Sequence, residues 1–506
     1  MGTQIKLSKK LAMDTLFQYI GIGSQSLSGL VFYIILMRIF STTLVGAVAL
    51  LLTILPIFSI TFTMGLNISA QHFTSYSLGA NSQIKNKATI SKILYLTIFQ
   101  SILGGLLLIL SSHWISLLLF HDARYTAVLN LLAITLSGDI LFRVLNGILL
   151  GLQKFKLIST INMISWITFY IGSAFMASIS GQMGSLIYGW IVGEFLGVVL
   201  CVIFLRRFLI GIFESFRLAF SNRVLMSYSL PLLMTDLISL GMIYVDRFIV
   251  AIMTGLSEIG VYNLSLLVVV GALSLVTPLN KIIISKFSEL FGKGHKHKLN
   301  TAVEVASIGM SSIYVPTAFT IAALSPMIVN FLGGKVYSGA IMPLTIMLVI
   351  SSFFVSKNVF FSALASIRET KILMFASGLG LLSNIALSIA LIPTYGLVGA
   401  AIGYSSVNLV TFIVCLYYGK RKGLFSLYIS GISKIWGISF LIFFMIRFME
   451  EILGKTSIDL VFYLGIAILV YIFSFKAVHP IGPEKFNDLF TSSKRIEKFL
   501  KFLNIT

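Results

Sequence analysis

The chain has 506 residues, of which 57% are hydrophobic and 11% are charged, and its mean hydropathy is +0.99. These values exclude an ordinary soluble globular protein and indicate a polytopic membrane protein. The net charge of +20 does not predict nucleic-acid binding, because the basic residues lie in short clusters between apolar runs. Cys201 and Cys415 both lie within apolar runs, so they predict neither a disulfide framework nor a metal site.

Apolar runs of about 20 residues predict fourteen membrane-spanning helices. The first run follows three lysines and is too long for a signal peptide, so we expect it to be retained. In chain order the expected spans are 14–39, 42–68, 93–119, 127–150, 157–179, 183–205, 225–253, 259–285, 302–328, 339–365, 371–393, 397–418, 430–448 and 458–476.

The basic residues predict how these spans are oriented. With a cytoplasmic N-terminus, the inner segments hold 29 lysines and arginines, whereas the outer segments hold 5. Because cytoplasmic loops carry an excess of Lys and Arg, this asymmetry places both termini in the cytoplasm. The outer connections are all short, which argues against an extracytoplasmic active site. We therefore expect a multi-pass protein of the cell membrane.

Two segments have an amphipathic helical pattern and are not expected to span. One lies in 206–224 and the other in the C-terminal tail, and we expect both at the inner membrane interface, although a solvated tail is the alternative for the second. Together with the spans they predict these domains: an N-lobe of helices one to six (1–205), an amphipathic linker (206–224), a C-lobe of helices seven to twelve (225–418), two additional helices (419–476) and a cytoplasmic tail (477–506).

Three short patterns recur in the two lobes at a nearly constant offset in residue number. The matched pairs are Gly46 with Gly260, Lys156 with Lys371, and Gly184 of Gly-Gln-Met-Gly with Gly399 of Gly-Leu-Val-Gly. The interval contains six spans, so both lobes have the same orientation in the membrane. This pattern predicts parallel repeats about an axis normal to the bilayer, with the substrate site at their interface.

The combined features point to a known family. They are two six-helix lobes, a Gly-x-x-Gly turn before helices six and twelve, an amphipathic linker, two extra C-terminal helices and, in and after helix seven, the residues Asp246, Arg247, Phe248, Gly260 and Tyr262. This order resembles the polysaccharide flippase branch of the multidrug/oligosaccharidyl-lipid/polysaccharide (MOP) exporter superfamily, over essentially the whole chain. The resemblance implies an all-α, MATE-like, V-shaped transporter that moves lipid-pyrophosphate-linked glycans by alternating access.

The sequence carries no motif that indicates an enzyme. Gly454-Lys455-Thr456 is similar to the tail of a phosphate-binding loop, but Met449 stands where the first glycine is needed. His295 and His297 have no third ligand nearby, so a solvated basic run explains them better than a metal site. We therefore expect no catalytic residue, no cofactor and no metal.

Seven charged residues lie in the interior of the predicted spans, away from the span ends, where charges are costly and usually face a protein interior or a water-filled cavity. Asp139 and Arg143 are four residues apart on one helical face and can pair locally. The other five are Glu194 on helix six, Asp236, Asp246 and Arg247 on helix seven, and Lys357 on helix ten. Arg143 and Lys357 are separated by the offset of the repeat, so we expect equivalent cations that bind a substrate phosphate in the inner half of a shared cavity.

Each of these roles has a structural alternative. Asp246 and Arg247 are expected to act as gate charges at the outer mouth, or else to serve in packing. Glu194 is a candidate for ion coupling, although the neighbouring Gly193 and Gly197 indicate close helix packing. For the two cavity cations, the alternative is that one extends to the inner interface. Asp139 and Asp236 complete the predicted cavity charges.

Two functional classes stay open at this point. A flippase for lipid-linked oligosaccharides requires cavity cations to receive phosphates, whereas an ion-coupled antiporter for drugs or organic cations requires carboxylates. A peptidoglycan-precursor flippase is a third relative, but the cationic first helix of that family is not evident here. We expect the glycan flippase: a monomer in the lipid bilayer, with a lipid-linked glycan as substrate, H+ or Na+ as the coupling ion and no nucleic-acid partner.

Overall fold

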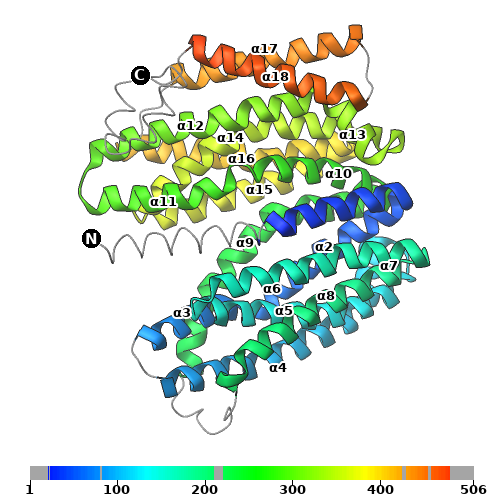
Figure 1. Ribbon diagram of the computed structural model, residues 1–506, viewed down its shortest axis with the longest axis vertical. Coiled ribbons are helices and arrows are strands. Elements are labelled where there is room, and N and C mark those ends of the chain that lie inside the picture. The colour runs from blue at the N-terminus through cyan, green and yellow to red at the C-terminus, as the bar shows by residue number, and fades with distance from the viewer. Residues whose placement is uncertain are drawn as a thin grey trace. The chain divides into compact units, whose positions relative to one another are not determined.

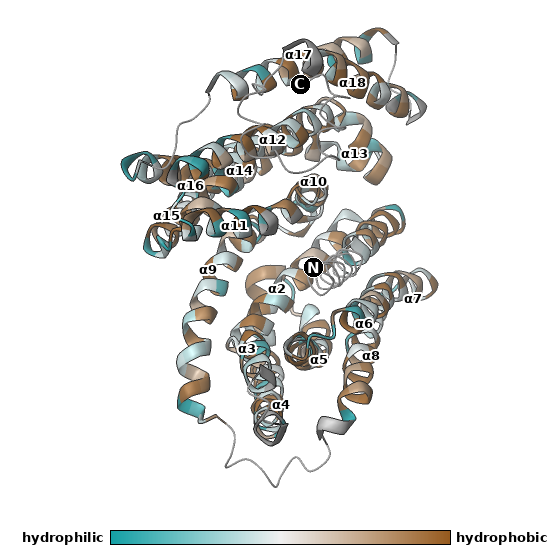
Figure 2. Ribbon diagram, turned by 60° about the vertical axis from the view of Figure 1, so that its left-hand side comes forward, coloured by the Kyte–Doolittle hydropathy of each residue, from teal (hydrophilic) through white to brown (hydrophobic). Residues whose placement is uncertain are grey.

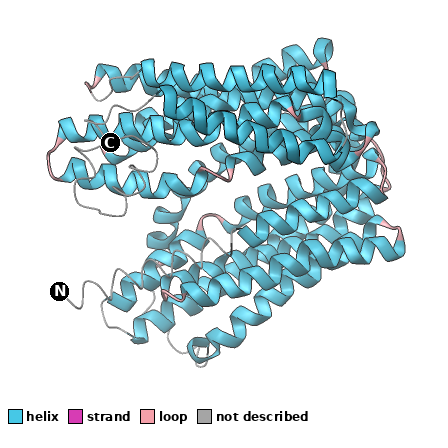
Figure 3. Cartoon of the chain, turned by 45° about the horizontal axis from the view of Figure 1, so that its top comes forward, coloured by secondary structure: helices cyan, strands magenta, loops and turns pink. Residues whose placement is uncertain are grey.

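The computed structural model describes residues 21, 23–79, 83–209, 220–423, 429–453 and 457–478. Throughout these ranges the regular elements are helices and no strand occurs (Figure 3). In the same ranges twelve helices are long and apolar enough to cross a membrane, and two shorter apolar helices, Gly23–Ile39 and Val461–Ser474, coincide with the first and last predicted spans. The prediction of an all-α polytopic membrane protein is confirmed.

Contacts divide the chain into two compact units. Unit 1 comprises residues 1–240 and 255–260, and unit 2 comprises residues 241–254 and 261–506. The helices of unit 1 follow in the order α2 (Thr42–Thr63), α3 (Leu66–Gly79), α4 (Gln83–Ile115), the π-helical turn η1 (Ser116–Phe120), α5 (Tyr125–Gly151), α6 (Phe155–Ile167), the π-helical turn η2 (Thr168–Gly172), α7 (Ser173–Ser180), α8 (Met183–Leu209) and the first part of α9 (Asn222–Thr254).

Unit 2 holds the rest of α9 and the helices that follow it. They are α10 (Leu256–Leu273, its first turn in unit 1), α11 (Thr277–Gly292), α12 (Lys296–Ala323), α13 (Ser325–Gly333), the 3-10 helix η4 (Lys335–Ala340), α14 (Ile341–Ser366), α15 (Thr370–Tyr395), α16 (Leu397–Arg421), α17 (Ile429–Leu453) and α18 (Ser457–Val478). Within this unit α14 packs against α12 and α16, and α16 also packs against α15 (Figure 1).

Several predicted spans are divided between two helices, and two of these breaks lie at corresponding places in the predicted lobes. The span expected at 42–68 ends as α2 at Thr63, because Met64 and Gly65 have φ of 49° and 72° and cannot continue a right-handed helix. A Cβ at Gly65 would lie 2.6 Å from the carbonyl oxygen of Ser229, so glycine is required there. The span expected at 259–285 is likewise divided into α10 and α11. The break therefore falls in the second helix of each predicted lobe.

The first turns of α2 and α10 contact each other through their backbones. A Cβ on Gly46 would collide with the carbonyl oxygen of Leu256, and a Cβ on Gly260 would collide with the carbonyl oxygen of Thr42. The hydroxyls of Thr42 and Ser257 also lie 2.8 Å apart. The two contacts match each other: Leu256, which meets Gly46, is four residues before Gly260, and Thr42, which meets Gly260, is four residues before Gly46.

The two predicted Gly-x-x-Gly turns are confirmed. Gly181 ends α7 with φ of 66°, and Gly396 ends α15 with φ of 55°. Both values lie in the left-handed region that glycine adopts at low cost, so both helices stop and the chain turns into α8 or α16. The parallel arrangement of the two lobes in a membrane stays a prediction.

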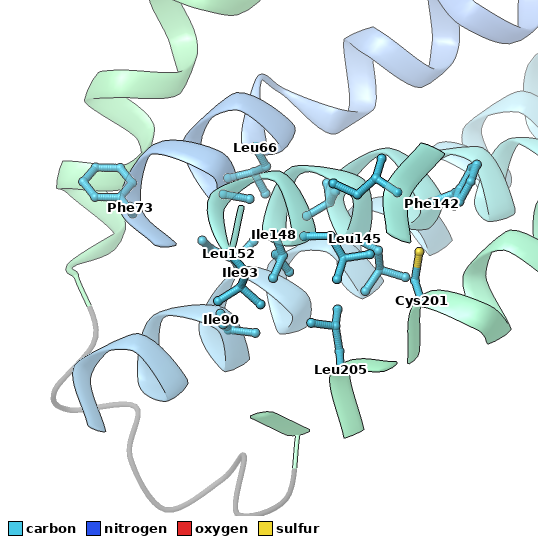
Figure 4. Packing of buried hydrophobic residues seen from close by; sticks show 14 of the residues in the cluster. Leu66, Phe73, Ile90, Ile93, Phe142, Leu145, Ile148, Leu152, Cys201 and Leu205 are labelled. Atoms are coloured by element: carbon cyan, nitrogen blue, oxygen red, sulfur yellow. The ribbon is translucent and has the colours of Figure 1, made fainter. Parts of the chain in front are cut away.

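Buried apolar residues hold each unit together. In unit 1 one cluster joins α3, α4, α5 and α8 around Leu145, Ile148 and Leu205 (Figure 4). In unit 2 the additional helices α17 and α18 pack against α12 and α13 through Ile442 and Tyr463. Hydrophobic residues also run along the outer faces of the helices (Figure 2), as expected for contact with lipid.

The linker 206–224 and the tail 477–506 lie largely outside the described residues. Their predicted interfacial helices, and the domain boundaries that depend on them, therefore stay predictions. The orientation of the termini is also a prediction, because it depends on the charge asymmetry of the loops.

Candidate functional site

Helix α5 carries an ion pair in the middle of unit 1. The Nε atom of Arg143 donates hydrogen bonds to both carboxylate oxygens of Asp139, at 3.0 and 2.9 Å. The Asp139 side chain is 4% exposed, whereas that of Arg143 is 32% exposed. The predicted local pair is confirmed, and the Arg143 side chain is more exposed than that of its partner.

Glu194 of α8 lies beside this ion pair and is 2% exposed. The close approach depends on Gly138, since a Cβ there would lie 3.1 Å from the Cβ of Glu194. Glu194 is within electrostatic range of Asp139 and Arg143. Within the described part of the chain, its Oε2 atom has no hydrogen-bond partner. A carboxyl group is therefore buried here with an oxygen that no protein group satisfies.

The glycines beside Glu194 fix the position of α8. A Cβ on Gly193 would lie 2.7 Å from the backbone of Phe169, and a Cβ on Gly197 would lie 2.6 Å from the ring of Phe142. Small residues allow such close helix contact in membrane proteins. The expected close packing is confirmed, and it places the carboxyl of Glu194 against α5.

A third carboxylate lies close enough to interact electrostatically with the same arginine. Asp236 of α9, in the unit 1 part of that helix, is half-buried and within electrostatic range of Arg143. The cluster thus contains the carboxyls of Asp139, Glu194 and Asp236 with one guanidinium. We refer to these four residues as the acidic cluster.

Unit 2 places a cation on α14 with a different set of neighbours. Lys357 is 9% exposed, and its ammonium donates a hydrogen bond to Asn408 Oδ1 of α16 at 3.2 Å. The same ammonium lies 4.8 Å from the ring centroid of Phe354. Among the described residues no ion pair of Lys357 occurs. Its partners are thus an amide and an aromatic ring, and both are neutral.

The two sites occupy matching positions along the chain. The offset in residue number from Arg143 to Lys357 is the same as the offset from Glu194 to Asn408. In unit 1 Arg143 of α5 lies within electrostatic range of Glu194 of α8. In unit 2 Lys357 of α14 donates a hydrogen bond to Asn408 of α16. In both units the polar side chain is on the second predicted span after the one that carries the cation. Asn408 was not among the predicted site residues. It could have been predicted, because adding the separation between Arg143 and Lys357 to the number of Glu194 gives position 408.

Asp246 is held by a tyrosine within unit 2. The carboxylate is fully buried, and Tyr262 of α10 donates a hydrogen bond to its Oδ2 atom at 2.6 Å. The Tyr262 hydroxyl is also 3.3 Å from the carbonyl oxygen of Ala400. Arg247 lies 4.8 Å from the ring centroid of Tyr244. Asp246 thus joins α9 to α10, while the predicted gate role of Asp246 and Arg247 stays a prediction.

The predicted site residues therefore fall into three places. Asp139, Arg143, Glu194 and Asp236 come together in unit 1, Lys357 is buried in unit 2, and Asp246 with Arg247 lies in the unit 2 part of α9. The shared cavity of Arg143 and Lys357 stays a prediction. No group of three or more metal-ligating side chains suited to a metal ion occurs among the residues that the structure describes.

The fold is that of transporters of the MOP superfamily. It is similar to the lipid II flippase MurJ in an inward closed conformation, with a TM-score of 0.75 and 18% identity, over 91% of this chain and 98% of that one. It is also similar to a multidrug resistance MATE family transporter in an inward-facing conformation, with a TM-score of 0.67 and 15% identity, over 81% of this chain and 95% of that one.

Sequence comparison gives the family. The family described as polysaccharide biosynthesis protein matches residues 35–343, and the chain belongs to this family. An uncharacterized membrane protein of Methanocaldococcus jannaschii is 24% identical over 331 residues, which cover 62% of this chain. The match spans 65% of that relative's own length.

Proposed function

We propose that this protein flips lipid-(pyro)phosphate-linked oligosaccharides or polysaccharide repeat units from the cytoplasmic to the outer leaflet by alternating access. Membership of the polysaccharide biosynthesis protein family supports a glycan substrate. The fold supports transport rather than an enzymatic reaction, since solved structures with this fold include a lipid II flippase and a MATE transporter.

The observation that carries this proposal is the environment of Lys357. A charge at membrane depth is costly unless it is paired, and among the described residues the contacts of this ammonium are the neutral Asn408 amide and the Phe354 ring. A phosphate would supply the missing negative charge through a charge-assisted hydrogen bond. The site therefore suits an anionic ligand that is present during only part of a transport cycle.

Arg143 is the second cation that suits this ligand. Its guanidinium is bound to Asp139 through Nε, while about a third of the side chain remains exposed. A guanidinium binds phosphate in a bidentate fork, so we propose Arg143 as a second group that binds the substrate phosphate.

A second candidate function is supported by the acidic cluster. Three carboxyls around one guanidinium favour a cationic ligand, as expected for an ion-coupled antiporter of drugs or organic cations. The two proposals differ in the sign of the charged groups that bind the substrate. The flippase requires Lys357, whereas the antiporter requires the carboxyls of unit 1.

The test is lipid translocation by the purified full-length chain in proteoliposomes. A fluorescent polyprenyl-pyrophosphate disaccharide is placed in both leaflets, and dithionite quenching measures how fast labelled lipid crosses. We expect Lys357→Gln to slow translocation by about tenfold or more, because one charged hydrogen bond contributes about 1.5–3 kcal/mol. Lys357→Arg keeps the charge and should retain part of the rate.

The matched control is Lys335→Gln, which removes an exposed lysine of η4 and should leave the rate unchanged. Wild-type translocation by the double variant Arg143→Gln, Lys357→Gln would overturn the phosphate-binding proposal. Efflux of an organic cation by that same variant would instead establish the antiporter.

A further inference from the structure

Three helices of unit 1 surround a hollow that the flippase proposal does not use. The hollow has a volume of about 460 Å³ and lies between the end of α5, the first turn of α6 and the last turns of α8. Lys154 and Arg206 line it, and the six other lining residues are apolar. Its volume is in the range of small-molecule sites. The lining suits a ligand with one charged group and an apolar part.

The hollow lies at the level of the membrane surface. The helices α5, α6 and α8 belong to candidate membrane spans, and each of these spans has an end at the hollow. Ile203 and Phe204 of α8 line the hollow and are also exposed on the outside of the helix. An apolar part of a ligand could therefore continue from the hollow along the lipid-facing side of α8.

The charge of the hollow indicates an anionic ligand. Neither Lys154 nor Arg206 forms an ion pair with a residue that the structure describes. Two cations in one site repel each other, whereas an anion between them is attracted to both. Helix α6 begins at Phe155 without a side-chain cap, so the amide groups of its first turn add to the positive potential.

Unit 2 contains a turn with the same backbone as the turn that carries Lys154. Gln153 and Arg368 have φ of 58° and 66°, and their offset is that of the two Gly-x-x-Gly turns. The amide of Lys154 donates a hydrogen bond to the carbonyl five positions earlier at 3.1 Å, and the amide of Glu369 does the same at 3.0 Å. Lys154 and Glu369 therefore hold the same place in two matching turns.

In unit 2 this place is closed by an ion pair. Lys422, at the end of α16, lies 2.7 Å from the carboxylate of Glu369. By the same offset Lys422 matches Arg207, which follows Arg206 in the sequence. Both helices thus end in a basic segment, but the residue in the turn is an acid in unit 2 and Lys154 in unit 1. The negative charge that balances the helix end in unit 2 is replaced by a positive one in unit 1.

We propose that the hollow binds an anionic phospholipid of the surrounding bilayer, with the lipid phosphate between Lys154 and Arg206. Guanidinium and ammonium groups both bind phosphate through charge-assisted hydrogen bonds, and basic pockets between helix ends hold anionic lipid head groups. The acyl chains lie along the apolar lining, which a free phosphate would leave in contact with water. The lipid phosphate takes the role that the Glu369 carboxylate has in unit 2, and it ties the turn between α5 and α6 to α8.

The test measures lipid binding and thermal unfolding of the delipidated full-length protein in detergent. The probes are dioleoyl phosphatidylglycerol, dioleoyl phosphatidylcholine, which has the same chains without net charge, and inorganic phosphate, which has charge without chains. A ligand that binds the folded protein alone raises the Tm by mass action. We expect phosphatidylglycerol to raise the Tm of the wild type more than either of the other probes does.

Two double variants locate the binding site by native mass spectrometry. Lys154→Gln, Arg206→Gln should bind phosphatidylglycerol about thirtyfold more weakly, which corresponds to about 2 kcal/mol for two basic residues near a membrane surface. The matched control is Lys87→Gln, Arg223→Gln. It removes the same charge from two exposed residues of unit 1, on α4 and α9, that do not line the hollow. This control should bind phosphatidylglycerol as the wild type does.

A third variant gives unit 1 the charge pattern of unit 2. Lys154→Glu places a carboxylate where unit 2 has Glu369, so an ion pair with the basic end of α8 replaces the lipid phosphate. Without added lipid its Tm should be above that of the wild type, and phosphatidylglycerol should no longer raise it. A substitution that only disturbed packing would lower the Tm.

Several outcomes would overturn this inference. They are equal lipid binding by the two double variants, or a wild-type response of Lys154→Glu to phosphatidylglycerol. An equal rise in Tm with inorganic phosphate would assign the hollow to a free anion. Displacement of bound phosphatidylglycerol by equimolar farnesyl pyrophosphate would assign it to a polyprenyl pyrophosphate. The flippase proposal is tested separately, through Lys357.

Discussion

Arg143 and Lys357 are separated by the offset of the predicted repeat, but their charges are balanced in different ways. In unit 1 Asp139 accepts hydrogen bonds from the guanidinium, and the Glu194 carboxyl lies close by. In unit 2 the ammonium has the amide of Asn408 as its hydrogen-bond partner. The side chains around the two cations thus differ, and this difference leaves one cation with a counter-charge and the other with neutral partners.

The two units share backbone features around these sites. In each unit the second helix is broken, and a glycine with positive φ ends the helix before α8 or α16. The contact between α2 and α10 is reciprocal at Gly46 and Gly260. The glycine positions of the two predicted lobes are therefore alike in backbone geometry, whereas the side chains around the two cations differ. Three further predictions test this comparison.

The largest effect is expected at the glycine contact. Gly46→Ala adds a Cβ that collides with the carbonyl oxygen of Leu256, so α2 and the first turn of α10 must separate. We expect a loss of about 3 kcal/mol in the free energy of unfolding, at the upper end for overpacking. Denaturation in mixed detergent micelles measures it.

Gly23→Ala is the control for that experiment, because no atom lies within 4 Å of a Cβ at this exposed helical position. Its stability should equal or exceed that of the wild type, since alanine favours helix. Equal stability of both variants would mean that the reciprocal contact does not hold α2 and α10 together.

A smaller effect is expected when the partner of a cation is removed. Asp139→Leu leaves Arg143 without the acceptor of its Nε hydrogen bonds, and should cost about 2 kcal/mol of unfolding free energy. Lys357→Met in unit 2 removes a cation that has only neutral partners, and should cost less than about 1 kcal/mol. The same denaturation experiment compares them, and equal losses would show that both cations are balanced alike.

The smallest effect is expected when the unit 2 site is given a carboxylate. Asn408→Asp places an acceptor with a negative charge beside Lys357, as in unit 1, and the ion pair then competes with substrate phosphate. We expect translocation of the labelled lipid to slow about tenfold, which corresponds to about 1.4 kcal/mol. Asn408→Ala removes the amide without adding charge and should be less impaired. Equal rates for the two variants would argue against competition for the ammonium.

Hydropathy and helical spacing were enough to predict the membrane-spanning helices and the ion pair of α5. Hydropathy is sufficient for the spans because partition between water and lipid depends on composition over about 20 residues. Spacing is sufficient for Asp139 and Arg143 because residues four apart on a helix lie on the same face. The matched glycines were also visible, since a turn with positive φ requires that residue type.

Which distant groups meet could be learned only from the folded chain. The breaks after Thr63 and Leu273 lie within apolar runs, where hydropathy cannot distinguish a continuous helix from two. Glu194 reaches α5 because Gly138 has no side chain, and Tyr262 reaches Asp246 because the chain reverses at Gly255 between α9 and α10. Such contacts depend on how helix surfaces fit together, and helical periodicity gives the face of each residue but not the helix that covers it.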